Sequence, residues 1–483
     1  MNRMAVINVA GLTGSLIGRA TPRIARFAAR GRMTRIEPAF PAVTCTAQAN
    51  YLTGKPPSQH GIVGNGWYDR SLDEVQFWKQ SNRLVESPKI WDAMRRIDPT
   101  FTCANLFWWF NMCSTADYSI TPRPAYPADG RKVFDIYSWP AHIRPEIKRD
   151  LGEFPFATFW GPAAGVKSAQ GAANAASRWI AESAKWIENH YAPTLNLIYL
   201  PHLDYSLQRR GPYRETPAGR EINPAILPDL AQIDAITGDL ISYFDARGVG
   251  VILLSEYGIT NVDTPIHLNR LFRQKGWITV REELGLEMLD CGASRVFAVA
   301  DHQVAHIYVN DPGLLPAVLE TLAAQPDIAH VFQEPELAGL NLRHRRAGDL
   351  VAVARERAWF TYYYWLDDKL APDFARCVDI HRKPGYDPVE LFLDPKIPLV
   401  KLKILWRLAR KQLGFRTLMD VIPLDATLVK GSHGRSDTAP GDHPVLISGT
   451  ASRALPEQIK SIDVASTLSA ALTDSEDTKT DCP

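Results

Sequence analysis

The stretch PAVTCTAQANYLTGKPPSQHGIVGN, residues 41–65, carries the strongest local signal for both fold and chemistry. Thr44 stands just before a predicted helix, where backbone N–H groups stabilise an anion. A hydroxyl at this position can accept a phosphoryl group once a metal ion or a base lowers its pKa. A threonine at a helix start also serves as an N-cap, so the position by itself leaves both roles open.

Short apolar runs on either side of this stretch are typical of buried parallel strands. We expect strands at 5–9, 196–200 and 249–254, and helices at 174–190 and 228–246, where apolar residues recur at helical spacing. Strands that alternate with helices indicate an α/β fold with a mostly parallel sheet sandwiched by helices. In such sheets ligands bind at the carboxyl ends of the strands.

The regular alternation of strands and helices stops between about residues 263 and 425. A strand–helix–strand pattern runs from AHIYVND through LLPAVLETLAA to IAHVF, and an aromatic, polar stretch follows it. We interpret 263–425 as an inserted α+β cap on a discontinuous core made of 1–262 and 426–473. The polar end, residues 474–483, is expected to be disordered.

Composition narrows the class of protein. The formal net charge is +1, so no global field favours a nucleic acid polymer as partner. No window has the ~20 apolar residues that a membrane span requires. The six cysteines show no paired spacing, and the N-terminal apolar run is too short for an export signal. We therefore expect free thiols and a cytoplasmic protein.

The string LTG-x-x-P-x-x-HGIVGN, here Leu52 to Asn65, resembles the type I phosphodiesterase/nucleotide pyrophosphatase branch of the alkaline-phosphatase superfamily. In that family a Thr or Ser nucleophile lies nine residues before the threonine of the TG pair, which is Thr53 here and points back to Thr44. The resemblance implies an alkaline-phosphatase-like fold, a phosphate-binding role for Asn65, and a small-molecule phosphate ester as substrate. It also implies two divalent ions, zinc by family habit, with manganese or magnesium as alternatives.

The positions that hold these ions in the family are only partly retained. Asp204 and His433 are retained, Glu256 is a plausible replacement, and Gln208 is a weak neutral ligand. Ala10 and Tyr257 stand where the family has an aspartate and a histidine. The resemblance therefore implies at most one well-bound ion, held by Asp204, His433, Glu256 and Gln208, or a rebuilt site.

Two further segments are candidates for substrate binding. Residues 107–139 are rich in aromatic and basic residues, so Arg123, Arg131 and Lys132 could pair with phosphate. Asp379 and His381 would share one face of a strand and could grip the substrate or bind a metal. The alternatives are an irregular packed insertion for the first segment and a solvated loop for the second.

Residues 396–416, KIPLVKLKILWRLARKQLGFR, form a basic amphipathic stretch. Such a stretch can lie on an anionic membrane, although packing of its apolar stripe against its own domain is the favoured interpretation.

The favoured function is a metal-dependent hydrolase of phosphate esters with Thr44 as nucleophile. The alternatives are a metal-poor pseudoenzyme that only binds its ligand, and a biosynthetic enzyme with altered chemistry on the same fold. The losses at Ala10 and Tyr257 support the first of these alternatives.

Overall fold

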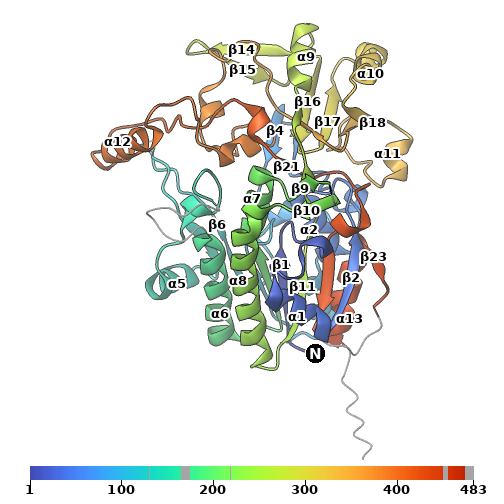
Figure 1. Cartoon of the computed structure of the whole chain (residues 1–483), viewed down its shortest axis with the longest axis vertical. Helices are drawn as coiled ribbons and strands as arrows, with labels where there is room; N and C mark the ends of the chain where they lie inside the picture. Colours follow the sequence, from blue (N-terminus) through green and yellow to red (C-terminus); the bar gives the residue numbers. More distant parts are fainter. Residues whose placement is uncertain (130, 165–173, 218, 450–454, 474–483) are drawn as a thin grey trace, which may run out of the picture.

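A large mixed β-sheet forms the centre of the molecule (Figure 1). The computed structural model describes residues 1–129, 131–164, 174–217, 219–449 and 455–473, so the predicted disordered tail at 474–483 lies outside the described residues. Within these ranges the strands run across the sheet in the order β23 (Gln458–Lys460), β2 (Arg32–Glu37), β22 (Val445–Ser448), β11 (Gly250–Leu254), β1 (Met4–Val9), β8 (Leu195–Leu200), β5 (Cys103–Leu106), β6 (Tyr118–Pro122) and β7 (Ile136–Trp139).

The parallel strands β11, β1, β8, β5 and β6 form the middle of this sheet, and every residue of β1 is buried. Both faces of such strands are covered, which explains why they read as continuous apolar runs. Asn8 pairs with Leu254, and Val9 pairs with Leu200. The carboxyl ends of β1, β8 and β11 therefore meet at one edge of the sheet.

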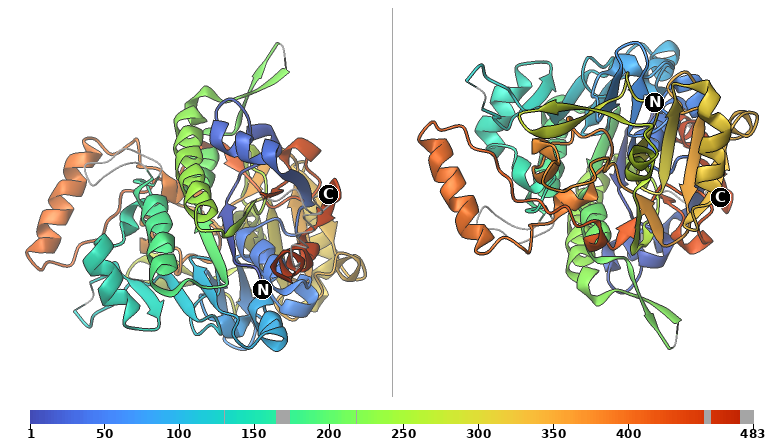
Figure 2. Two further views of the ribbon diagram at one scale, coloured as in Figure 1. Left: turned by 90° about the horizontal axis from the view of Figure 1, so that it is seen from below. Right: turned by 90° about the horizontal axis from the view of Figure 1, so that it is seen from above.

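Helices flank this sheet (Figure 2). The helix α8 (Leu227–Asp245) packs against α1 (Pro22–Arg30), α6 (Ala175–Tyr191) and α7 (His202–Arg210), while α5 (Ile143–Leu151) packs against α6. The helix α2 (Thr44–Thr53) packs against α3 (Pro57–His60) and α13 (Val464–Thr473), which also contacts α4 (Ile90–Ile97). The α/β fold with a mostly parallel sheet sandwiched by helices is confirmed.

An antiparallel sheet in the order β16 (Val296–Asp301), β17 (Val304–Val309), β19 (Leu350–Ala354) and β18 (Ile328–Phe332) lies above the first in Figure 1. Its hydrophobic core is built mostly from residues 262–429. The helices of this region are α9 (Leu268–Gln274), α10 (Leu315–Ala323), α11 (Glu336–Gly339) and α12 (Val400–Gln412).

Short strand pairs complete the described structure. They are β3 (Gly66–Asp69) with β4 (Glu74–Phe77), β9 (Tyr213–Thr216) with β10 (Gly219–Ile222), β12 (Thr260–Asn261) with β21 (Gly431–Ser432), β13 (Thr264–Ile266) with β20 (Ala358–Phe360), and β14 (Thr279–Glu283) with β15 (Leu286–Asp290). None of the helices in the described ranges combines the length and apolar composition of a transmembrane span.

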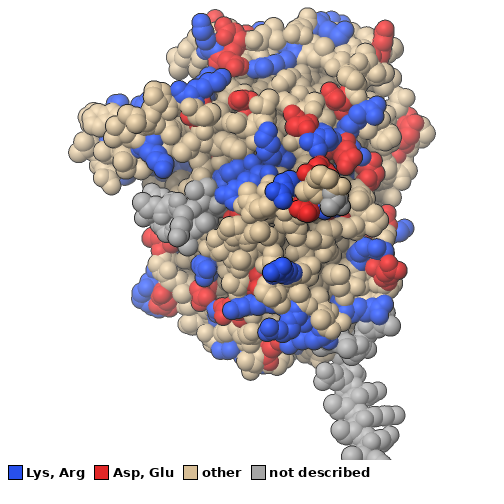
Figure 3. Space-filling model, viewed as in Figure 1, with Lys and Arg blue, Asp and Glu red and all other residues tan. Residues whose placement is uncertain are grey.

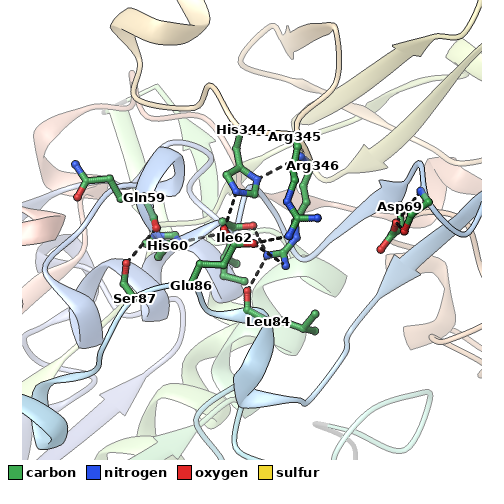
Figure 4. A network of polar contacts seen from close by, with 12 residues as sticks. Gln59, His60, Ile62, Asp69, Leu84, Glu86, Ser87, His344, Arg345 and Arg346 are labelled. Atoms are coloured by element: carbon green, nitrogen blue, oxygen red, sulfur yellow. Dashed lines mark hydrogen bonds and ion pairs between the residues drawn. The ribbon is translucent and has the colours of Figure 1, made fainter.

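The buried side chain of Arg346 ties this second sheet to the loop that follows α3 (Figure 4). Its Nη1 donates to the carbonyl oxygens of Gly61 at 2.8 Å and Leu84 at 2.7 Å. Its Nη2 lies 3.2 Å from the carboxylate of Glu86, and its guanidinium lies over the Trp67 ring. Since Gly61 begins the GIVGN segment, Arg346 helps to hold the loop that carries Asn65.

We expect Arg346→Met to lower the free energy of unfolding by about 2–4 kcal/mol, because it removes the donor to the buried carbonyl oxygen of Gly61 and the partly buried one of Leu84. The neighbouring Arg345 contacts the same Glu86, but its side chain is 69% exposed. Arg345→Met should therefore cost no more than about 0.5 kcal/mol. Urea unfolding of both variants measures the difference. Equal decreases in the free energy of unfolding would show that the buried contacts of Arg346 contribute no more to stability than the exposed contact of Arg345.

Candidate active site

Thr44 is the first residue of α2, and its side chain is only 4% exposed. The helix starts after Val43, which is extended, and ends at Gly54, whose φ of 63° lies in the left-handed region that glycine favours. The Oδ1 atom of Asn65 accepts a hydrogen bond from the backbone N–H of Cys45 at 3.0 Å. Asn65 thus satisfies one of the N–H groups that a helix start leaves without a partner.

A continuous chain of hydrogen bonds begins at Thr44. Its Oγ1 lies 3.1 Å from the Oη of Tyr257, which donates to Asp204 Oδ1 at 3.2 Å. A tyrosine hydroxyl has one proton, so Thr44 is the donor to Tyr257. On the other side, Gln208 Nε2 donates to Asp204 Oδ2 at 2.6 Å, and Tyr386 Oη donates to Gln208 Oε1 at 3.0 Å. Protein groups therefore partner both oxygens of Asp204.

Burial controls the protonation of Asp204. Removal from water raises the pKa of its carboxyl group to about 7, and the hydrogen bonds from Gln208 and Tyr257 act in the opposite direction. Burial also raises the pKa of the Tyr257 hydroxyl well above its ordinary value, with the charge of Asp204 adding to the effect. Tyr257 is therefore a neutral hydroxyl that can pass a proton between its two neighbours.

Aromatic rings pack tightly around this chain. The Tyr257 ring stacks on His433 with centroids 3.6 Å apart, His433 lies 3.6 Å from His302, and His302 lies 3.7 Å from Tyr386. His433 Nδ1 is 2.8 Å from the carbonyl oxygen of Ala42, which can only accept, so this nitrogen carries the proton. Burial lowers the pKa of His433 to about 3, which keeps its ring neutral.

Glu256 is buried beside Thr44 but turns toward amide groups. Its Oε1 accepts from Asn8 Nδ2 at 2.6 Å and from Gln48 Nε2, while its Oε2 has no hydrogen-bond partner among the described residues. Burial raises the pKa of Glu256 to about 8, and the hydrogen bonds from Gln48 and Asn8 oppose this rise. The carboxyl group is therefore largely neutral at pH 7.

The predicted ligand set does not fit a divalent metal ion. Gln208 presents its amide nitrogen, not its oxygen, to Asp204, and Glu256 is held by amide donors. His433 Nε2 lies 3.8 Å from Asp204 Oδ1. Within the described ranges, no group of three or more His, Cys, Asp or Glu side chains is placed to hold a metal ion. The ion expected at Asp204, His433, Glu256 and Gln208 stays a prediction that this arrangement does not support, because Tyr257 and Gln208 are hydrogen-bonded to the oxygens of Asp204 that a metal would use.

A narrow cavity of about 50 Å³ opens over Thr44. Among the described residues, its lining contains no lysine or arginine. The lining residues are Thr44, Trp78, Trp109, Phe159, Trp160, Tyr199, Asp204, Tyr205, Tyr257, His302, Ile380, Tyr386 and His433. Of the predicted site residues, Thr44, Asp204 and His433 face this cavity.

Asn65 stands behind Thr44 and is held by the tip of the β16–β17 hairpin. Its Nδ2 donates to Asp301 Oδ1 at 3.0 Å, and its backbone N–H donates to Asp301 Oδ2 at 2.7 Å. With its Oδ1 bound to Cys45, the amide of Asn65 positions the start of α2 and is not part of the cavity wall.

The predicted substrate-binding residues lie outside the cavity lining. Arg123 and Arg131 are exposed, and Arg131 pairs with Asp129 at 2.6 Å. Lys132 is half-buried beside α12, where its carbonyl oxygen accepts from Lys411 Nζ.

The strand predicted at Asp379 and His381 is instead a turn. The turn forms because the backbone N–H of Asp379 donates to Glu390 Oε1 at 2.9 Å and its carbonyl accepts from Arg382. Of this segment, Ile380 is the residue that reaches the cavity, together with Tyr386.

Sequence reasoning missed most of the aromatic wall. Trp109 lies in the aromatic segment 107–139, a candidate for substrate binding, and its backbone N–H donates to Gln48 Oε1 at 2.6 Å. Trp78 and Trp160 carry no local signal, because they reach the cavity from a strand end and an irregular segment far apart in the chain.

Comparison with known proteins gives a family and a fold. The model of the family described as type I phosphodiesterase/nucleotide pyrophosphatase matches residues 4–387. No curated protein matches the chain significantly in sequence.

The similar solved structures share the fold of the chain at low sequence identity. One is murine ectonucleotide pyrophosphatase/phosphodiesterase 5 with AMP, at 14% identity and a TM-score of 0.56, covering 98% of this chain and 95% of that one. Another is phosphonoacetate hydrolase from Sinorhizobium meliloti 1021 with phosphonoformate, at 14% identity and a TM-score of 0.59, covering 98% and 96%.

We expect Glu256→Gln to remove part of the pH dependence of stability. The folded-state pKa of about 8 lies above the ordinary 4.5, so the contribution of Glu256 to stability is lost as pH rises through this range. Glutamine keeps the accepting oxygen without a charge. The melting temperature of the Glu256→Gln variant should equal that of the wild type at pH 5 and exceed it by about 1–3 °C at pH 9.

Glu457→Gln is the matched control, because this side chain is 84% exposed. Thermal melts of both variants across pH 5–9 should separate only for Glu256→Gln. A difference in melting temperature between Glu256→Gln and the wild type that stays constant from pH 5 to 9 would contradict a neutral, buried Glu256.

Proposed function

The chain belongs to the type I phosphodiesterase/nucleotide pyrophosphatase family, and on this premise we propose that it hydrolyses small phosphate esters with Thr44 as nucleophile. The observation that carries the proposal is the hydrogen-bonded series Thr44–Tyr257–Asp204 at the cavity wall. It supplies a hydroxyl with a path for its proton to a buried carboxylate, which is what an activated nucleophile requires.

In the proposed first step, Thr44 Oγ1 attacks phosphorus as its proton moves to Tyr257 Oη and the proton of Tyr257 moves to Asp204 Oδ1. The new Oγ1–P bond forms while the bond from phosphorus to the leaving oxygen breaks. The leaving alkoxide takes a proton from water and produces hydroxide. Hydroxide then forms a bond to the phosphorus of the phosphothreonine as the Oγ1–P bond breaks. The released Thr44 Oγ1 recovers its proton through Tyr257 from Asp204, which leaves the phosphate product and the free hydroxyl.

The charge of the cavity favours some phosphate esters over others. With no lysine or arginine among the described lining residues, a doubly charged monoester would be buried without a compensating charge. A diester carries a single negative charge, which the start of α2 favours. The tryptophan rings of the wall suit a planar or apolar leaving group. We therefore infer that the substrate is a small diester with such a group.

The neighbours with this fold support a small phosphorus-containing substrate. The murine protein was solved with AMP, and the bacterial hydrolase with phosphonoformate and phosphonoacetate. A pocket that encloses a ligand of such size normally offers roughly 300 Å³ or more. Since the cavity over Thr44 offers about 50 Å³, its aromatic wall must open to admit the substrate.

A divalent ion has no step in this proposal. The family implies a metal that would neutralise charge on the phosphoryl group. The donors do not fit one here, because Tyr257 and Gln208 already satisfy Asp204. The proton path to Asp204 is the chain's own means of activating Thr44.

A second candidate is a binding protein that retains the fold without turnover. The same observation favours it in part, because every polar group from Thr44 to Tyr386 already has a protein partner. Such a protein would bind a phosphate diester without cleaving it.

We expect Thr44→Ala to lower kcat for a chromogenic diester such as bis(p-nitrophenyl) phosphate by about 10³-fold or more, because the nucleophile is lost. Thr44→Ser should retain activity. Tyr257→Phe should lower kcat by about 10²–10⁴-fold, because the proton path is cut while the ring remains.

Thr53→Ala, at the other end of α2, is the matched control and should keep wild-type kcat. Equal activity of Thr44→Ala and the wild type would rule out Thr44 as nucleophile. Binding of the diester by calorimetry with no turnover would favour the second candidate.

We also expect dialysis against a chelator to leave diesterase activity within about twofold of the untreated enzyme, since Asp204 is already partnered by protein donors. Elemental analysis should find far less than one zinc per chain. Loss of activity on dialysis with recovery on added zinc would contradict a proton path that works without metal.

A further inference from the structure

The helix α12 presents its apolar stripe to solvent. Leu402, Leu405 and Trp406 are 60%, 63% and 64% exposed, and Ala409 and Leu413 continue the stripe at helical spacing. In α12, every residue of which is described, no residue is buried. Such a stripe normally gains its stability by burial, so an outward stripe marks a surface that something else covers.

Charged pairs hold α12 in this orientation. Lys403 Nζ lies 2.9 Å from the Asp420 carboxylate, and Arg407 Nη2 lies 3.2 Å from it. Val400 and Ile404 are partly buried against the hydrophobic core that the antiparallel β16–β17–β19–β18 sheet shares with residues 262–429. The expectation that the stripe packs against its own domain is met by these two residues and in part by half-buried Leu408. The paired Lys403 and Arg407 lie on the inner side, and the rest of the stripe is exposed.

A basic rim surrounds the stripe. Residues 396–416 contain seven lysines and arginines and no acidic residue, although the whole chain has a formal net charge of only +1. Lys411 Nζ donates to the carbonyl oxygen of Lys132, and Arg416 Nε donates to that of Asp129. These contacts place Arg131 and Lys132 beside α12, with exposed Tyr126 and Phe134 nearby in the same segment. Figure 3 shows α12 as a protrusion that is mostly tan with blue patches around it.

We propose that α12 and its basic rim form a docking surface for an anionic membrane. An interfacial helix combines an apolar face that includes tryptophan with flanking lysine and arginine residues, and α12 has both features. The absence of acidic residues from 396–416 matches the negative surface of anionic lipids. A single short stripe contributes modest apolar burial, so binding depends on charge and falls as salt rises.

Sedimentation with sucrose-loaded vesicles, using the whole chain of 483 residues, tests the proposal. One set contains phosphatidylcholine with about 30% phosphatidylglycerol, and the other contains phosphatidylcholine alone. We expect at least tenfold stronger partition onto the anionic vesicles at low salt, with most of it lost at high salt. Equal partition onto both sets, or none onto either, would overturn the proposal.

Two pairs of substitutions test separately what the apolar stripe and the basic rim contribute to vesicle binding. Leu405→Glu with Trp406→Glu should reduce anionic-vesicle binding at least tenfold, and so should Lys401→Glu with Arg410→Glu. Leu284→Glu is the matched control, because Leu284 is a fully exposed leucine in the β14–β15 turn, and it should bind as the wild type. The changed residues are exposed or half-buried, so circular dichroism should show unchanged folding. Binding that survives both pairs of changes would sink the proposal.

Sedimentation equilibrium tests whether a second copy of the chain, and not a membrane, covers the stripe. A concentration-dependent dimer that Leu405→Glu with Trp406→Glu abolishes, together with no vesicle binding by the wild type, would assign the stripe to a second copy of the chain. A monomer that binds anionic vesicles supports the membrane assignment.

Discussion

The buried carboxylate of Asp204 is the group on which the arrangement of the site depends. A carboxylate removed from water is costly unless its oxygens are paired. In this chain Tyr257 and Gln208 provide the partners, and each is in turn fixed by a neighbour, Thr44 on one side and Tyr386 on the other. The position of the Thr44 hydroxyl therefore follows from how the protein satisfies Asp204.

The second sheet is part of this arrangement. The turn between β16 and β17 brings Asp301 to Asn65, His302 to the ring of His433, and the backbone N–H of Gln303 to the carbonyl oxygen of His433 at 2.8 Å. His302 adopts a φ of 62°, which is unfavourable for a side chain of this kind and is maintained by the contacts around it. Residues that lie outside the central sheet thus set both the start of α2 and one wall of the cavity.

The sequence predicts the parts of the molecule that local patterns determine. Buried apolar runs mark β1, β8 and β11. The family resemblance points to Thr44, Asp204 and His433, which all line the cavity. Side-chain direction depends on partners far away in the chain. Glu256 turns to Asn8, 248 residues distant, and no local pattern contains that contact.

Loop geometry is unpredictable for the same reason. An Asp-x-His spacing suits a strand, but the segment around Asp379 becomes a turn because the buried Glu390 captures its backbone N–H. The Glu390 carboxylate is in turn 2.7 Å from Lys383 Nζ, within a charged group that only the folded chain assembles.

The helix α12 shows why an amphipathic pattern alone does not say which face points inward. A stripe such as Leu402, Leu405 and Trp406 would ordinarily pack against the core. Here Asp420 binds Lys403 and Arg407 on the inner side, and these pairs occupy the space that the stripe would need. The direction of the stripe is therefore decided by Asp420, a residue outside the helix, and not by the apolar pattern of α12 itself.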